Sequence, residues 1–217
     1  MSRWERHRTS TAEDAVAFWR TAGADVLNDM MDTGAWPEWL RVAAGVIREP
    51  GSVWEPGCGF GLLATVLPEG CAYEGCDIND GYVAEAIRRF SGPGRMFVTQ
   101  DFYEVLDRAG DAPVFDWVIV ASLLGMFPEE EAYALLPRFW SLARRGMAMT
   151  TVDGDVYGRF TSERHEFTSH RPRELEAAMD ALPGAARVRL RRGSEFPILG
   201  RSLWRRVGLV AYAWRSA

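Results

Sequence analysis

Short apolar runs alternate with amphipathic segments along most of the chain. The segments between the runs carry apolar residues at helical spacing. The run at 115–121 is almost continuously apolar, which is typical of a strand buried on both faces. Alternating strands and helices of this kind predict an α/β fold with a doubly wound, mainly parallel sheet and helices on both faces. The expected strands are residues 53–54, 72–76, 96–98, 115–121, 147–152, 187–191 and 209–214.

The chain before the first strand is expected to be helical. Ser10 and Glu13 have the spacing of a capping box, and the apolar face that follows predicts one helix ending at Gly34. A second helix is expected before a Pro-Gly break ahead of the first strand. We therefore divide the chain into an N-terminal helical segment, residues 1–50, and a core, residues 51–217, within a single domain overall.

A glycine-rich segment follows the first expected strand. Residues 55–61 read Glu-Pro-Gly-Cys-Gly-Phe-Gly, and apolar residues then resume at helical spacing from Leu62 to Leu67. The predicted order is strand, glycine-rich turn and helix. Glycine lacks a Cβ and tolerates positive φ, so a ligand can approach this backbone closely. An ordinary tight turn is the alternative interpretation.

An acidic residue, Asp77, ends the second expected strand. Dinucleotide-binding folds place an acid at this position to bind a ribose. Their G-x-G-x-x-G spacing would require glycine at position 62, where this chain has Leu62. The spacing found here is E-x-G-x-G-x-G, which argues against a dinucleotide.

The stretch from Val53 to Met126 resembles the class I S-adenosylmethionine (SAM) dependent methyltransferases. Four motifs occur in the order of that family: the glycine turn, Asp77-Ile78, Gln100-Asp101-Phe102 and the strand at 115–121. The resemblance implies a Rossmann-like doubly wound seven-stranded sheet of order 3-2-1-4-5-7-6 with an antiparallel seventh strand. It also implies methyl transfer from SAM, with residues 1–50 as a lid over the cofactor.

The same resemblance implies a cofactor site at the ends of four strands. Glu55 is expected near the methionine amino group, Asp77 at the ribose, Asp101 at the adenine amine, and Ala121 and Ser122 beside the sulfonium. A helix N-cap is the alternative role for Asp101. The expected cofactor-binding residues are Glu55, Gly57, Cys58, Gly59, Gly61, Asp77, Ile78, Asp101, Phe102, Ala121 and Ser122.

The half of the site that would bind the methyl acceptor is less defined. His165 and His170 are candidate general bases, because histidine titrates nearest neutral pH. Trp19 and Tyr157 are candidate substrate contacts. A solvated loop for either histidine and core packing for Trp19 are the alternatives.

Other titratable residues limit the possible chemistry. The net charge of −5 does not favour general nucleic-acid binding. Lysine is absent from the sequence, which excludes a lysine base. Asp153 and Asp155 are interpreted as part of a turn and not as a metal site. An arginine cluster near the C-terminus could dock an acidic partner or RNA, or could be the solvated face of an edge strand. Its members are Arg187, Arg189, Arg191, Arg192, Arg201, Arg205 and Arg206.

Cysteine usage and hydropathy suggest the cellular location. Cys58, Cys71 and Cys76 are odd in number and do not have zinc-site spacing, which favours free thiols in the cytoplasm. The N-terminus lacks the apolar core of a signal peptide, and no apolar run approaches transmembrane length. We therefore expect a cytoplasmic protein without membrane contact.

Together these features predict a SAM-dependent methyltransferase that is a monomer or homodimer. The expected acceptor is an oxygen, nitrogen or carbon nucleophile of a small molecule, such as a secondary metabolite. Two alternatives remain open: a protein or RNA methyltransferase that docks through the arginine cluster, and a non-catalytic SAM-binding protein.

Overall fold

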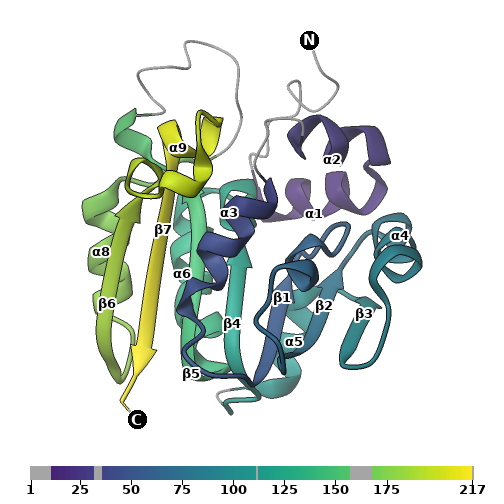
Figure 1. Ribbon diagram of the computed structural model, residues 1–217, viewed down its shortest axis with the longest axis horizontal. Helices are drawn as coiled ribbons and strands as arrows, with labels where there is room; N and C mark the ends of the chain where they lie inside the picture. The colour runs from purple at the N-terminus through teal and green to yellow at the C-terminus, as the bar shows by residue number, and fades with distance from the viewer. Residues whose placement is uncertain (1–10, 32–35, 111, 157–167, 217) are drawn as a thin grey trace.

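The computed structural model describes residues 11–31, 36–110, 112–156 and 168–216 (Figure 1). Within them, seven strands form one sheet of order β3-β2-β1-β4-β5-β7-β6. β7 is antiparallel to both of its neighbours, and the other pairs are parallel. The predicted fold class and strand order are confirmed. The strands are β1 (Ser52–Pro56), β2 (Ala72–Asp77), β3 (Arg95–Thr99), β4 (Phe115–Ala121), β5 (Ala143–Val152), β6 (Ala185–Arg192) and β7 (Gly208–Arg215).

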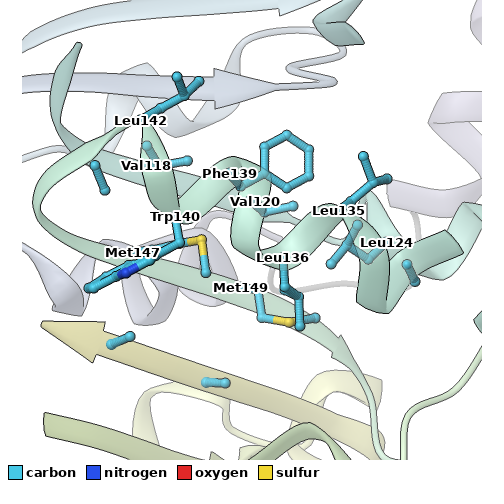
Figure 2. Packing of buried hydrophobic residues seen from close by; sticks show 14 of the residues in the cluster. Val118, Val120, Leu124, Leu135, Leu136, Phe139, Trp140, Leu142, Met147 and Met149 are labelled. Atoms are coloured by element: carbon cyan, nitrogen blue, oxygen red, sulfur yellow. The ribbon is translucent and has the colours of Figure 1, made fainter. Parts of the chain in front are cut away.

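Two layers of buried side chains cover the two faces of the sheet. Because side chains alternate along a strand, Val118 and Val120 of β4 enter one layer, whereas Trp117 and Ile119 enter the other. The first layer packs against α5, α6 and α8, and the second packs against α3, α4 and α9. Figure 2 shows the part of the first layer formed by β4, β5 and α6. The helices are α1 (Ala12–Thr21), α2 (Ala24–Met31), α3 (Trp36–Ala43), α4 (Asp80–Phe90), α5 (Phe102–Ala109), α6 (Glu129–Ser141), α8 (Pro172–Asp180) and α9 (Leu203–Val207).

The N-terminal helical segment differs from the sequence prediction. The single helix expected up to Gly34 is divided into α1 and α2, because Ala22 is extended (ψ 133°) and Gly23 is a weak helix former. The capping box lies one residue later than predicted. The Asp14 N–H donates to Thr11 Oγ1 at 3.1 Å, and the Thr11 N–H donates to Asp14 Oδ2 at 3.2 Å.

The prediction of a full helix after the glycine turn was wrong. The structure has one 3₁₀ turn, Leu62–Thr65, after Gly61. Pro68 disfavours helical geometry at the residue before it, and Thr65 Oγ1 donates to the Leu62 carbonyl at 2.8 Å. The apolar spacing instead reflects a short turn whose Leu63 side chain is fully buried.

Two further observations concern the described part of the chain. Cys58, Cys71 and Cys76 are free thiols. No helix there has both the length and the apolar character needed to cross a membrane.

Candidate active site

A cavity of about 990 Å³, counted out to the solvent, lies at the carboxyl ends of β1, β2 and β4. Open α/β sheets bind ligands at this position. Its walls come from the turns that follow these strands, from the start of α5 and from helices α1, α2 and α3.

The turn after β1 forms one wall of this cavity. Gly57, Gly59 and Gly61 have φ values of 66°, 52° and 72°, which favour glycine. Gly57, Gly59 and the buried Cys58 line the cavity. Gly61 is not among the described lining residues, and a Cβ there would lie 2.4 Å from Phe97 Cε1. Two glycines therefore leave space at the cavity, and the third allows close packing behind it.

Glu55 is a buried carboxyl in the cavity wall. The Tyr73 hydroxyl donates to its Oε2 at 2.5 Å. Burial raises the pKa of Glu55 to about 8; the bond from Tyr73 lowers it, and the charge of Asp77 raises it further. A cationic ligand group beside this carboxyl would favour its ionised form.

Asp77 connects the end of β2 to the glycine turn. Its Oδ2 accepts from the Gly59 N–H at 2.8 Å, and its Oδ1 accepts from the Asn79 N–H at 2.9 Å. Burial raises the pKa of Asp77, and these backbone bonds oppose the rise. Asp77 and Ile78 both line the cavity. A carboxylate oxygen can accept more than one hydrogen bond, so Asp77 can order the turn and also bind a ligand.

Asp101 is the N-cap of α5 and also lines the cavity, together with Gln100 and Phe102. Its Oδ1 accepts from the Tyr103 N–H at 3.0 Å. The capping role that was the alternative for Asp101 is therefore present, and it places the carboxyl at the cavity.

Ala121 and Ser122 line the cavity at the end of β4. Ser122 has a φ of 57°, a left-handed conformation that is uncommon for a residue with a Cβ. Two bonds from β5 hold it there: its N–H donates to the Thr150 carbonyl at 3.1 Å and to Thr150 Oγ1 at 3.0 Å. Strained residues of this kind cluster at functional sites.

The remaining walls of the cavity are apolar. They come from α1, α2, α3 and the turn after β4, through Ala15, Val16, Trp19, Leu27, Trp36, Leu40, Leu123, Met126 and Phe127. Among the described lining residues, Glu55, Asp77 and Asp101 supply three carboxyl groups, and none is arginine or histidine. This combination suits a cationic ligand together with an apolar molecule.

Three tryptophans stack behind the apolar wall. Trp204 of α9 lies between Trp36 and Trp39 of α3, with ring centroids 4.8 Å and 5.1 Å apart and ring planes within 15°. Trp36 lines the cavity, whereas Trp39 is fully buried. The stack therefore fixes part of the cavity wall to the C-terminal region.

One of the two candidate bases, His170, is not among the described residues that line the cavity. His170 is fully buried, its Nδ1 lies 3.0 Å from Thr151 Oγ1, and the Tyr133 ring packs against it edge-on at 5.2 Å. Burial lowers the pKa of His170 to about 4. This position indicates a packing role. His165 and Tyr157 lie outside the described residues.

The predicted arginine cluster is partly engaged in ion pairs. Arg192 Nε lies 2.6 Å from Oδ2 of the buried Asp153, and Arg192 also lies 3.6 Å from Asp155. Arg191 Nε lies 3.0 Å from Glu195 Oε2. Arg187, Arg189, Arg191 and Arg192 belong to β6, an edge strand, whereas Arg205 and Arg206 belong to α9. Within the described ranges, no three histidine, cysteine or acidic residues form a group that could hold a metal ion.

Comparison with known proteins identifies the fold. No protein-family model and no curated protein matches the sequence. Solved structures do match, among them the Burkholderia thailandensis 1,6-didemethyltoxoflavin-N1-methyltransferase with bound 1,6-didemethyltoxoflavin and S-adenosylhomocysteine (TM-score 0.68, 16% identity, 97% of this chain and 93% of that chain). A SAM-dependent methyltransferase from Archaeoglobus fulgidus gives a TM-score of 0.67 at 16% identity, over 89% of this chain and 100% of the other.

A third match is the magnesium protoporphyrin IX methyltransferase ChlM from Synechocystis PCC 6803 with bound S-adenosylhomocysteine. It has a TM-score of 0.58 and 22% identity, and covers 88% of this chain and 84% of that chain. This chain has the class I methyltransferase fold. In this chain, the cavity described above lies at the strand ends where the sequence motifs predicted a cofactor site.

Sequence reasoning missed several residues of this site. The sequence predicted Tyr73 only as part of a strand. Gly75, two residues later, is the sequence feature that could have indicated its contact with Glu55. A Cβ at Gly75 would lie 2.4 Å from the Tyr73 hydroxyl, so glycine leaves room for that hydroxyl to reach Glu55. Leu27 and Trp36 also line the cavity, but nothing in their local sequence distinguishes them from core residues.

Proposed function

We propose that this chain is a SAM-dependent methyltransferase that acts on a small molecule. One observation carries the proposal: a single cavity in a methyltransferase fold combines glycines at positive φ, three carboxyl groups and an apolar half. SAM has a nucleoside, a sulfonium cation and an amino acid part, so its charge complements these carboxyl groups.

Each part of the cavity has a role in this proposal. Glu55 binds the amino group of the methionine part, and Asp77 accepts hydrogen bonds from the ribose hydroxyls. Asp101 accepts from the adenine amine, with Ile78 and Phe102 against the base. The support is that these side chains line one cavity and come from the ends of β1 and β2 and the start of α5, on neighbouring parts of the sheet.

The cofactor, when bound, supplies a methyl group already activated by the sulfonium. The residues of this chain hold the acceptor in line with that group and exclude water. Such positioning contributes about 7–11 kcal/mol to catalysis in well-oriented systems. Ala121 and Ser122 at the end of β4 are the proposed neighbours of the reacting centre.

The apolar half of the cavity is the proposed acceptor site. Trp19, Leu27 and Trp36 on the N-terminal helices, with Met126 and Phe127 opposite, favour a molecule with a hydrophobic or aromatic body. In this proposal α1 and α2 form a lid. Two of the compared structures are methyltransferases named for small molecules, 1,6-didemethyltoxoflavin and magnesium protoporphyrin IX, which supports a small-molecule acceptor.

The test has a binding step and a turnover step. Calorimetry should show that SAM and S-adenosylhomocysteine bind and that NAD does not. Incubation with SAM and a panel of apolar and aromatic hydroxyl, amine and carbon nucleophiles should then give a product heavier by one methylene, detected by mass spectrometry. Binding of NAD without binding of either sulfur nucleoside would contradict the proposal.

A further inference from the structure

Asn79 connects the end of β2 to the N-terminal helices. Its buried side chain caps α4, where Oδ1 accepts from the Tyr82 N–H at 3.1 Å. Its Nδ2 donates to the carbonyls of Trp19 and Ala22, both at 2.9 Å. Its backbone N–H donates to Asp77 Oδ1 at 2.9 Å. Asn79 therefore contacts the proposed ribose-binding acid and the end of α1, and it is itself the N-cap of α4.

The hydrogen-bonding pattern permits one orientation of the Asn79 amide. A reversed amide would place Nδ2 against the Tyr82 N–H and Oδ1 against two carbonyls. Tyr82 adds a third bond, because its hydroxyl donates to the Gly23 carbonyl at 3.0 Å. Burial raises the pKa of Tyr82, so the hydroxyl keeps the proton that it donates.

These three bonds satisfy carbonyls at the C-terminal end of α1 and in the α1–α2 turn. The last four carbonyls of a helix lack partners within it, so side chains from the core can hold that end. The helices held in this way lie above β1 and β2 in Figure 1, and Ala15, Val16, Trp19 and Leu27 of these helices line the cavity. Leu27 of α2 lies so close to the glycine turn that a Cβ on Gly59 would come 2.9 Å from Leu27 Cδ2.

We propose that Asn79 and Tyr82 form a latch that holds α1 and α2 over the cofactor site and so sets how long a bound nucleoside remains. The part concerning residence time rests on the proposed function, because it requires SAM or its product in this cavity. Asn79 is not among the residues that line the cavity, whereas Tyr82 is. Asn79 therefore acts as a positioning residue, through the helices. The test of an effect through the helices alone is the Asn79 variant.

Two variants separate the latch from the other roles of these residues. Asn79→Ser keeps a side-chain oxygen for the cap of α4, since serine caps helices about as well as asparagine, but it cannot reach the carbonyls of α1. Tyr82→Phe removes one hydroxyl and keeps the ring that packs edge-on against Phe60. Tyr133→Phe is the matched control, because within the described structure the buried Tyr133 hydroxyl has no hydrogen-bond partner.

The first measurement is the dissociation rate of S-adenosylhomocysteine, obtained by stopped-flow displacement with excess SAM. The net free-energy contribution of one hydrogen bond corresponds to about a threefold to tenfold change in a rate or an equilibrium constant. We expect dissociation about threefold faster in Tyr82→Phe, about tenfold faster in Asn79→Ser, and unchanged in Tyr133→Phe. Rates equal to wild type in the first two variants would overturn the proposed effect on residence time.

The second measurement needs no ligand. Hydrogen exchange followed by mass spectrometry should show faster exchange in α1 and α2 of Asn79→Ser and Tyr82→Phe, with β1, β4 and β5 unchanged. Unaltered exchange in α1 and α2 would overturn the latch itself. Faster exchange in a protein whose wild type binds no S-adenosylhomocysteine would support the latch, but it would contradict the proposed function and the residence-time role.

Discussion

The buried carboxyl of Glu55 provides a quantitative prediction, namely that binding of the cofactor releases a proton. Its pKa is raised to about 8, chiefly by burial, so at pH 7 about nine-tenths of the unliganded molecules hold a proton there. The α-amino group of the ligand is mainly an ammonium at pH 7. If Glu55 pairs with the ammonium of the ligand, the carboxyl must ionise when the ligand binds.

The magnitude follows from this difference in proton binding. Close to one proton should be released per complex at pH 7. The affinity should rise by nearly tenfold from pH 6 to pH 7, which equals about 1.4 kcal/mol. The rise should become shallower near pH 8, because Glu55 is then half ionised before binding.

Calorimetry in two buffers of different ionisation enthalpy measures the number of protons released. S-adenosylhomocysteine should release about one proton at pH 7, whereas 5′-methylthioadenosine, which lacks the amino acid part, should release almost none. Glu55→Gln should abolish the release and weaken S-adenosylhomocysteine, while leaving 5′-methylthioadenosine nearly unaffected. Equal release with both ligands, or release that persists in Glu55→Gln, would refute the reasoning.

Three further variants test other parts of the structure. Asp77→Ala should reduce SAM affinity at least a hundredfold, because it removes an acceptor for the ribose and two hydrogen bonds that order the turn. The far-UV circular dichroism spectrum should be unchanged, and unaltered affinity by calorimetry would contradict the assignment of Asp77 to the ribose. Gly61→Ala should cost about 2–5 kcal/mol in thermal unfolding, because the new Cβ combines positive φ with a collision at Phe97. Gly184→Ala, also at positive φ (70°) but with only an Arg215 nitrogen at 3.5 Å, should cost distinctly less, and equal losses would argue against the collision. Trp204→Ala should lower the free energy of unfolding by about 3–5 kcal/mol, because the tryptophan stack is lost. Leu203→Ala, at a side chain that is 40% exposed, should lower it by about 0.5 kcal/mol or less, and similar losses in the two variants would contradict the role of the stack.

The sheet was predictable because its signal is local and repeated. Continuous apolar runs such as 115–121 mark buried parallel strands, and the four motifs defined their order through resemblance. The places of Asp77 and Asp101 beside the cavity agree with what the resemblance implied, since Asp77 ends β2 and Asp101 lies two residues beyond β3. Local sequence could not separate a packed 3₁₀ turn from a helix after Gly61, since both bury apolar residues at similar spacing.

Contacts between distant parts of the chain were beyond the sequence. Asn79 reaches the Trp19 carbonyl across 60 residues, and the sequence marks Asn79 only as the start of a helix. The burial of His170 depends on its packing against Tyr133 of α6, which no local pattern reveals. The sequence therefore could not show that His170 is a buried side chain.

Binding of S-adenosylhomocysteine to the wild-type protein, measured by isothermal titration calorimetry, tests the central claim most directly. The account predicts one site per chain, occupied by this nucleoside and by SAM, and weakened at least a hundredfold by Asp77→Ala. Absence of heat with both nucleosides from a folded protein, or equal binding by wild type and Asp77→Ala, would contradict it.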